Sequence, residues 1–79
     1  MNLSLPKMLK QFRKDKDMTQ EEVASHLGVT YQSVSRWENG LSYPDIELLP
    51  CIAALFDVSL DKLFGTDKES EEATIKNYD

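Results

Sequence analysis

Histidine and cysteine, two side chains that often perform catalysis or hold a metal ion, are scarce in this chain of 79 residues. His26 and Cys51 are the single histidine and the single cysteine, so neither an internal disulfide nor a cysteine-pair zinc site can form. No glycine-framed nucleophile, phosphate-binding loop or metal-ligand spacing accompanies His26. This argues against a small hydrolase, and we expect no enzymatic activity, no metal and no cofactor. We expect His26 to be an exposed helix residue and Cys51 to pack in the interior.

A second set of polar side chains, in residues 31–39, has the chemistry to recognise the edges of nucleic-acid bases. A helix that turns about 100° per residue directs Val34 and Trp37 to one side and these polar side chains to the other. The polar side carries no acid and no large aliphatic residue. Glutamine pairs with adenine, arginine pairs with guanine, serine bonds to several base edges, and an aromatic ring fits against a thymine methyl. The predicted DNA-reading face consists of Tyr31, Gln32, Ser35, Arg36 and Asn39.

Helix signals predict an all-α fold of five short helices over residues 1–65. The apolar residues of the first helix repeat at helical spacing behind Ser4, a candidate N-cap. A fourth helix follows Asp45, and Pro50 makes it begin late or open irregularly. A short last helix is expected at residues 60–64. No stretch alternates apolar and polar residues for long enough to form a strand.

Residues 20–39 have the spacing of two helices joined by a tight turn. Thr19 and Glu22 form a capping box, in which each side chain accepts a hydrogen bond from the other residue's backbone N–H. Gly28 ends the first of the two helices at a position that favours positive φ. Thr30 is the candidate cap of the second helix. The pattern predicts a helix-turn-helix unit, with the polar face on its second helix.

The net charge of −5 is unevenly distributed along the chain. Residues 1–65 carry 7 Lys and Arg against 9 Asp and Glu, a net of −2, and residues 66–79 carry 2 against 5, a net of −3. The second stretch has few apolar groups, so we expect an acidic tail or linker there, or the start of a further helix. The small charge of the folded part predicts few phosphate contacts and weak non-specific binding to DNA. Without a signal peptide or a membrane-length apolar run, we expect a cytoplasmic protein that does not contact membranes.

Three segments, LKQFRKDKDMTQEEVASHLGV, SVSRWENGLSYPD and LFDVSLDKLFG, resemble the phage repressor/Cro-type helix-turn-helix family, also called the xenobiotic-response-element type. The resemblance covers roughly Leu5–Gly65. It implies a compact, lambda-repressor-like bundle of five helices whose second and third helices form the DNA-reading unit. It also implies a sequence-specific transcriptional regulator that binds double-stranded DNA, usually as a dimer, and we expect repression.

The resemblance also implies roles for individual positions. Gln20 would contact a phosphate and brace Gln32, and Arg13 and Glu38 would form a structural ion pair. Contacts to bases or to the DNA backbone are implied for Thr30, Tyr31, Gln32, Ser35, Arg36, Asn39, Ser42 and Tyr43.

The dimer surface is less sharply defined by the sequence. A symmetric dimer would place two copies of the 31–39 helix in successive major grooves, about 34 Å apart, on a pseudo-palindromic operator. Leu60, Leu63, Phe64 and Leu48 are candidates for the surface between the copies. The alternative function is a protein-interaction module of the same fold, such as an antitoxin. We also expect an effector or oligomerisation domain outside this chain, as part of a longer regulator.

Overall fold

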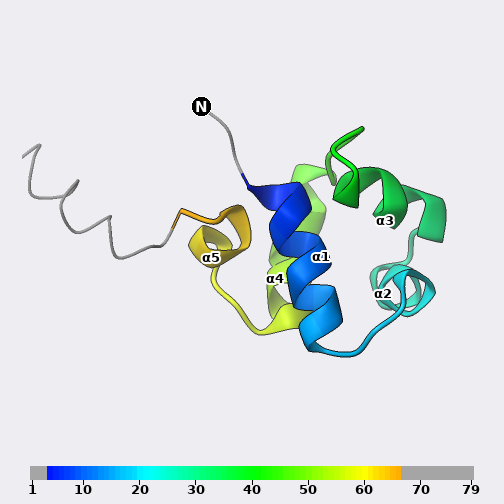
Figure 1. Cartoon of the computed structure of the whole chain (residues 1–79), viewed down its shortest axis with the longest axis horizontal. Coiled ribbons are helices and arrows are strands. Elements are labelled where there is room, and N and C mark those ends of the chain that lie inside the picture. The colour runs from blue at the N-terminus through cyan, green and yellow to red at the C-terminus, as the bar shows by residue number, and fades with distance from the viewer. Residues whose placement is uncertain (1–3, 67–79) are drawn as a thin grey trace, which may run out of the picture.

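The computed structural model describes residues 4–66, and every regular element within that range is helical. The predicted acidic tail lies outside the described residues, apart from Thr66. α1 lies centrally, with α2 and α3 to one side and α5 to the other (Figure 1). Within this part of the chain, no helix has the length and apolar character needed to cross a membrane. The elements are α1 (Leu5–Asp15), α2 (Gln20–Leu27), α3 (Tyr31–Glu38), the 3-10 turn η1 (Ile46–Leu48), α4 (Leu49–Phe56) and α5 (Leu60–Phe64).

The hydrophobic core receives side chains from all five α-helices, as the predicted bundle requires. Ile52 of α4 and Leu63 of α5 have no exposed surface. The rings of Phe12 and Phe56 join α1 to α4, with their centroids 6.0 Å apart. Trp37 is 5% exposed and packs in the core, so α3 is held by its apolar side. The buried apolar residues are Leu5, Leu9, Phe12, Val23, Ala24, Val34, Trp37, Ile52, Ala53, Phe56 and Leu63.

The capping residues predicted from the sequence form the ends of the helix-turn-helix unit. The Thr19 hydroxyl accepts from the Glu22 N–H at 3.0 Å, and the Glu22 carboxylate accepts from the Thr19 N–H at 2.8 Å. Gly28 ends α2 with φ +73°, and the Thr30 hydroxyl accepts from the third backbone N–H of α3. Both helix ends that face the turn are therefore capped by residues close to them in the chain.

The start of α1 differs from the prediction. Ser4 directly precedes α1, but its side chain makes no capping hydrogen bond. Its φ of −91° and ψ of 20° are not the extended angles that aim a capping hydroxyl into the first turn. Instead, the Ser4 N–H donates to the Phe64 carbonyl oxygen at 3.2 Å and ties α1 to the end of α5. Gly65 fits tightly beside this contact, because a Cβ added there would lie 2.8 Å from the Ser4 Cβ.

The irregular opening predicted for the fourth helix is confirmed. The 3-10 turn η1 precedes α4, and Pro50 occupies the first turn of α4, where a missing N–H leaves no hydrogen bond unmade. α3 ends one residue earlier than predicted, because Asn39 is its C-cap rather than its last residue.

Two predictions about apolar residues are wrong. Cys51 is exposed, because the inward stripe of α4 passes through Ile52 and Phe56 and places Cys51 about 100° to the side. Leu63 is fully buried in this chain's own core and so has no surface to offer a second copy. Leu60 remains 41% exposed, as a residue on the outer face of α5.

Candidate nucleic-acid interface

The polar face of α3 points away from the core, as the helical spacing predicts. Val34 is 2% exposed and Trp37 is 5% exposed, and these two side chains fix the rotation of α3 about its axis. Tyr31, at the start of the helix, is 46% exposed. Gln32, Arg36 and Asn39 are also exposed, and Ser35 is half-buried. The residues predicted to read DNA therefore lie on one accessible helix face.

Thr30 and Ser33 are hydrogen-bonded to one another at the start of α3. The Thr30 Oγ1 accepts from the Ser33 N–H at 3.2 Å, and the two hydroxyl oxygens lie 3.1 Å apart, within hydrogen-bonding distance. This pair stabilises the first turn of α3. The hydroxyl of Thr30, one of the predicted DNA contacts, thus also has a structural role in the free protein.

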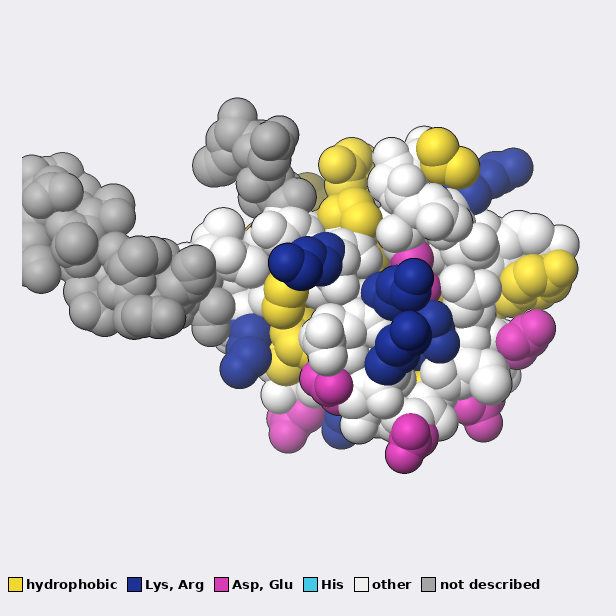
Figure 2. Space-filling view, in the orientation of Figure 1, with side chains coloured by type: hydrophobic (Ala, Val, Ile, Leu, Met, Phe, Trp, Pro, Cys, Tyr) yellow, Lys and Arg dark blue, Asp and Glu magenta, His cyan; other side chains and the backbone are white. Residues whose placement is uncertain are grey.

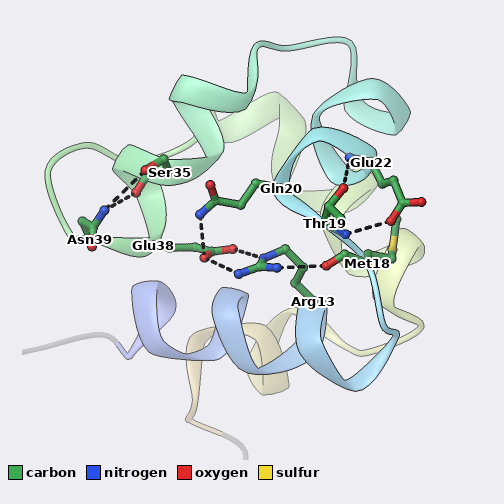
Figure 3. Close-up of polar contacts among 8 residues, drawn as sticks. All are labelled: Arg13, Met18, Thr19, Gln20, Glu22, Ser35, Glu38 and Asn39. Atoms are coloured by element: carbon green, nitrogen blue, oxygen red, sulfur yellow. Dashed lines mark hydrogen bonds and ion pairs between the residues drawn. The ribbon is translucent and has the colours of Figure 1, made fainter.

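Asn39 and Ser35 form a second local pair at the far end of the face (Figure 3). The Asn39 Nδ2 donates to the Ser35 carbonyl oxygen at 2.9 Å and to the Ser35 Oγ at 3.4 Å. The donor group of the Asn39 amide is therefore directed at its own helix. A partner molecule would meet the amide oxygen of Asn39, which is an acceptor.

Arg13 and Glu38 join α1 to α3 as a paired set of hydrogen bonds (Figure 3). The Arg13 Nε donates to the Glu38 Oε2 at 2.7 Å, and the Arg13 Nη2 donates to the Glu38 Oε1 at 3.1 Å. The Arg13 Nη1 also donates to the Met18 carbonyl oxygen at 2.9 Å. The hydrogen bonds to Glu38 raise the pKa of Arg13 above its ordinary value. The structure thus contains the ion pair that the family resemblance implies.

Gln20 is the third member of this junction, which the sequence did not reveal. Its Nε2 donates to the Glu38 Oε1 at 3.1 Å, so α2 joins α1 and α3 at the same carboxylate. Among the described residues its amide is directed at Glu38, and not at Gln32 as expected. Residues 20 and 38 lie on helices that meet only in the fold, and no local pattern in the sequence signals their contact.

An open depression of about 510 Å³ lies beside this junction at the start of α2. Its lining mixes cationic, anionic and neutral polar side chains, so it has no single preferred ligand charge. The lining residues are Arg13, Lys14, Asp17, Met18, Thr19, Gln20 and Glu21.

The charges near the polar face of α3 favour an anionic partner. Glu38 is the acid of α3, but its side chain is 3% exposed and pairs with Arg13, so its charge is withdrawn from the surface. Arg36 is exposed on the same helix. Lysine and arginine side chains also gather over α1 (Figure 2). The face therefore presents neutral polar groups and a cation without an exposed acid among them.

The loop after α3 carries apolar side chains that are unusually accessible. Leu41 is 74% exposed, Tyr43 is 60% exposed and Ile46 is 79% exposed, while Ser42 is half-buried. The family resemblance implies a contact between Tyr43 and the DNA backbone, but nothing in the sequence indicates that Ile46 is exposed. Ile46 and Leu48 are both apolar, and the sequence alone does not show which of the two side chains the 3-10 turn η1 directs outward.

Comparison with known proteins agrees with this geometry. A family model described as helix-turn-helix matches residues 9–63. The transcriptional activator BcrR of Enterococcus faecalis is 40% identical over 79 residues, covering 89% of this chain and 39% of BcrR. The antitoxin PezA of Streptococcus pneumoniae is 40% identical over 75 residues, covering 89% of this chain and 48% of PezA.

The fold also matches solved structures. The P22 c2 repressor in complex with a synthetic operator superposes with a TM-score of 0.75 at 24% identity, covering 85% of this chain and all of that one. At this identity the likeness concerns the fold. This chain spans less than half the length of BcrR and PezA. Because the family model covers most of the chain and the paired helices lie as the family requires, the chain belongs to the helix-turn-helix family.

Proposed function

We propose that this chain is a sequence-specific DNA-binding domain of a transcriptional regulator, which reads the major groove with the exposed face of α3. The observation that carries the proposal is the rotation of α3. Its buried side chains, Val34 and Trp37, leave accessible the groups that match base edges. The likeness to BcrR, a transcriptional activator that is 40% identical to this chain, supports this function.

Within this proposal the residues of the face have different tasks. Gln32 and Arg36 contact base edges, because both are exposed and both carry side chains with paired hydrogen-bonding groups. Tyr31 at the start of the helix and Ser35 one turn further along contact bases or methyl groups. Asn39 presents its amide oxygen to an exocyclic amine.

Residues before and after the reading residues of α3 contact the DNA backbone. Gln20 and Thr30 precede the reading residues, and Ser42 and Tyr43 follow them in the loop after α3. Backbone contacts position a reading helix but carry little sequence information themselves.

We propose that the chain binds DNA as a homodimer. A small domain with few basic residues gains affinity when two copies bind successive half-sites, about 34 Å apart. Leu60 and Phe64 are the remaining candidates on α5 for the surface between the copies, because Leu63 is buried. Repression follows where such an operator overlaps a promoter and the bound dimer blocks polymerase.

A protein-interaction module is the second candidate function. The exposed side chains of Leu41, Tyr43 and Ile46 favour it, and so does the likeness to the antitoxin PezA. The two functions differ in their surfaces, since an interaction module would use this apolar loop rather than the polar face of α3.

Selection of bound duplexes from a random pool, at two salt concentrations, tests the proposed function. An inverted repeat with half-sites one helical turn apart is the expected result. If no sequence is enriched even at the lower salt concentration, DNA reading is wrong and the interaction module is favoured.

A further inference from the structure

We propose that Glu38 is a positioning residue for DNA binding: its carboxylate, held by Arg13, orients the side-chain amide of Gln20 toward the duplex. This inference rests on the proposed DNA-binding function. Glu38 then contributes to DNA binding as well as to the stability of the bundle, because its carboxylate is hydrogen-bonded to Gln20 at the edge of the reading surface.

The Glu38 carboxylate is buried and held by hydrogen bonds from two other helices. Its side chain is 3% exposed and accepts three hydrogen bonds, two from Arg13 and one from Gln20. A carboxylate accepts about four hydrogen bonds, so most of its capacity is used inside the protein. The bonds from Arg13 are charge-assisted and come from a planar fork, which restricts rotation of the acid.

This carboxylate determines which way the Gln20 amide faces. The Gln20 Nε2 lies 3.1 Å from the Glu38 Oε1. The opposite orientation would set the amide oxygen against a carboxylate oxygen, and two acceptors repel one another. The amide oxygen and the second Nε2–H of Gln20 are therefore left for a partner molecule.

The orientation matters for a phosphate contact in particular. Phosphate oxygens only accept hydrogen bonds, so the second Nε2–H of Gln20 is the side-chain group that can reach one. Gln20 is half-buried, is the first residue of α2, and lines the open depression beside α1. If the Gln20 amide could rotate freely, ordering it on binding would cost conformational entropy and weaken the contact to the phosphate.

A double-mutant cycle with Gln20→Ala and Glu38→Gln tests the inference. Binding is measured on a labelled duplex that carries the half-sites recovered by selection. Each single variant is expected to bind about tenfold more weakly, which corresponds to about 1.4 kcal/mol. The double variant is expected to bind no more weakly than either single variant, because Glu38 acts through Gln20.

Glu22→Gln is the matched control. It removes one negative charge from the same region, but Glu22 bonds to the Thr19 N–H and not to Gln20. Its effect on binding is expected to be the same whether residue 20 is Gln or Ala. This control separates loss of positioning from a general change in charge.

Two outcomes of the cycle would overturn the inference. In the first, Glu38→Gln and Gln20→Ala combine multiplicatively to about a hundredfold loss. In the second, Glu38→Gln binds as tightly as the parent. If instead the parent shows no sequence preference at all, the proposed function itself fails.

A measurement without DNA covers the case in which Glu38→Gln folds poorly. The side-chain amide protons of Gln20 are followed by NMR in the parent chain, and their signals are assigned by their loss in Gln20→Ala. A shifted, slowly exchanging signal in the parent is expected from the bond to the carboxylate. Signals at the positions of a freely solvated glutamine would overturn the inference.

Discussion

Arg13 and Glu38 meet through two hydrogen bonds of 2.7 and 3.1 Å, although 25 residues separate them in the chain. The contact joins the central helix α1 to the reading helix α3 at a point where both side chains are largely withdrawn from water. A third bond from Gln20 brings α2 to the same carboxylate. One polar junction therefore fixes how the helix-turn-helix unit sits on the rest of the bundle.

Removing one partner of this pair should destabilise the fold strongly. Arg13→Met is expected to lower the free energy of unfolding by about 3 kcal/mol, because it leaves the Glu38 carboxylate buried without its cation. The double variant Arg13→Met, Glu38→Met should recover most of the loss, since apolar groups of similar size replace both charges. Urea denaturation measures both values. A single variant within about 0.5 kcal/mol of the parent would contradict this account of the pair.

The contribution of Arg13 should not vary with pH near neutrality. The hydrogen bonds from Arg13 to Glu38 raise the pKa of Arg13 in the folded state. A raised folded pKa gives stability that is fully present below the unfolded value and is lost only as the pH rises through the folded value. Both lie far above neutrality for arginine. The stability difference between the parent and Arg13→Met should therefore be equal at about pH 7 and about pH 9, and a difference that shrinks by pH 9 would contradict this.

Two glycines should differ in their tolerance of alanine. Gly28 and Gly65 have φ of +73° and +76°, a conformation that costs other residues about 1–2 kcal/mol. Nothing lies within 4 Å of a Cβ added at Gly28, whereas one at Gly65 meets the Ser4 Cβ at 2.8 Å. We expect Gly65→Ala to lower the melting temperature more than Gly28→Ala. Adding Ser4→Gly should restore part of the loss at Gly65 and none of the loss at Gly28.

The salt dependence of DNA binding should be shallow for a helix-turn-helix dimer. Arg36 is the exposed cation of α3, so we expect lysine or arginine to neutralise two or three phosphates per copy and the slope of log K against log salt to be about −4 to −5. Fluorescence anisotropy over a series of salt concentrations measures the slope. A slope of about −8 or steeper would show many more phosphate contacts than this surface can supply.

Local signals in the sequence were sufficient to predict where α2 begins and ends and where α3 begins. Thr19 and Glu22 satisfy one another within one turn, and Gly28 adopts positive φ as the C-cap of α2, with its N–H bonded to the Ala24 carbonyl oxygen. Such features depend on a few neighbouring residues, so spacing alone reveals them. The buried position of Trp37 and the exposure of the α3 face follow in the same way from helical periodicity.

Features that depend on packing between helices were predicted less well. The prediction that Cys51 packs in the interior is wrong, because Ile52 and Phe56 set the rotation of α4 and leave Cys51 exposed. The bond from Gln20 to Glu38 exists only where α2 and α3 cross, and no pattern within either helix encodes it. The family resemblance supplied the Arg13–Glu38 pair, which spacing alone would not have indicated.

The central claim is that the exposed face of α3 reads base pairs, and base-specific binding of two variants tests it most directly. The parent, Gln32→Ala and Arg36→Ala are titrated with the selected operator and with duplexes that change each of its base pairs in turn. Each variant is expected to lose about 1–3 kcal/mol of discrimination at one base pair per half-site and to keep its preferences elsewhere. If both variants bind every duplex as tightly and as selectively as the parent, α3 does not read the DNA.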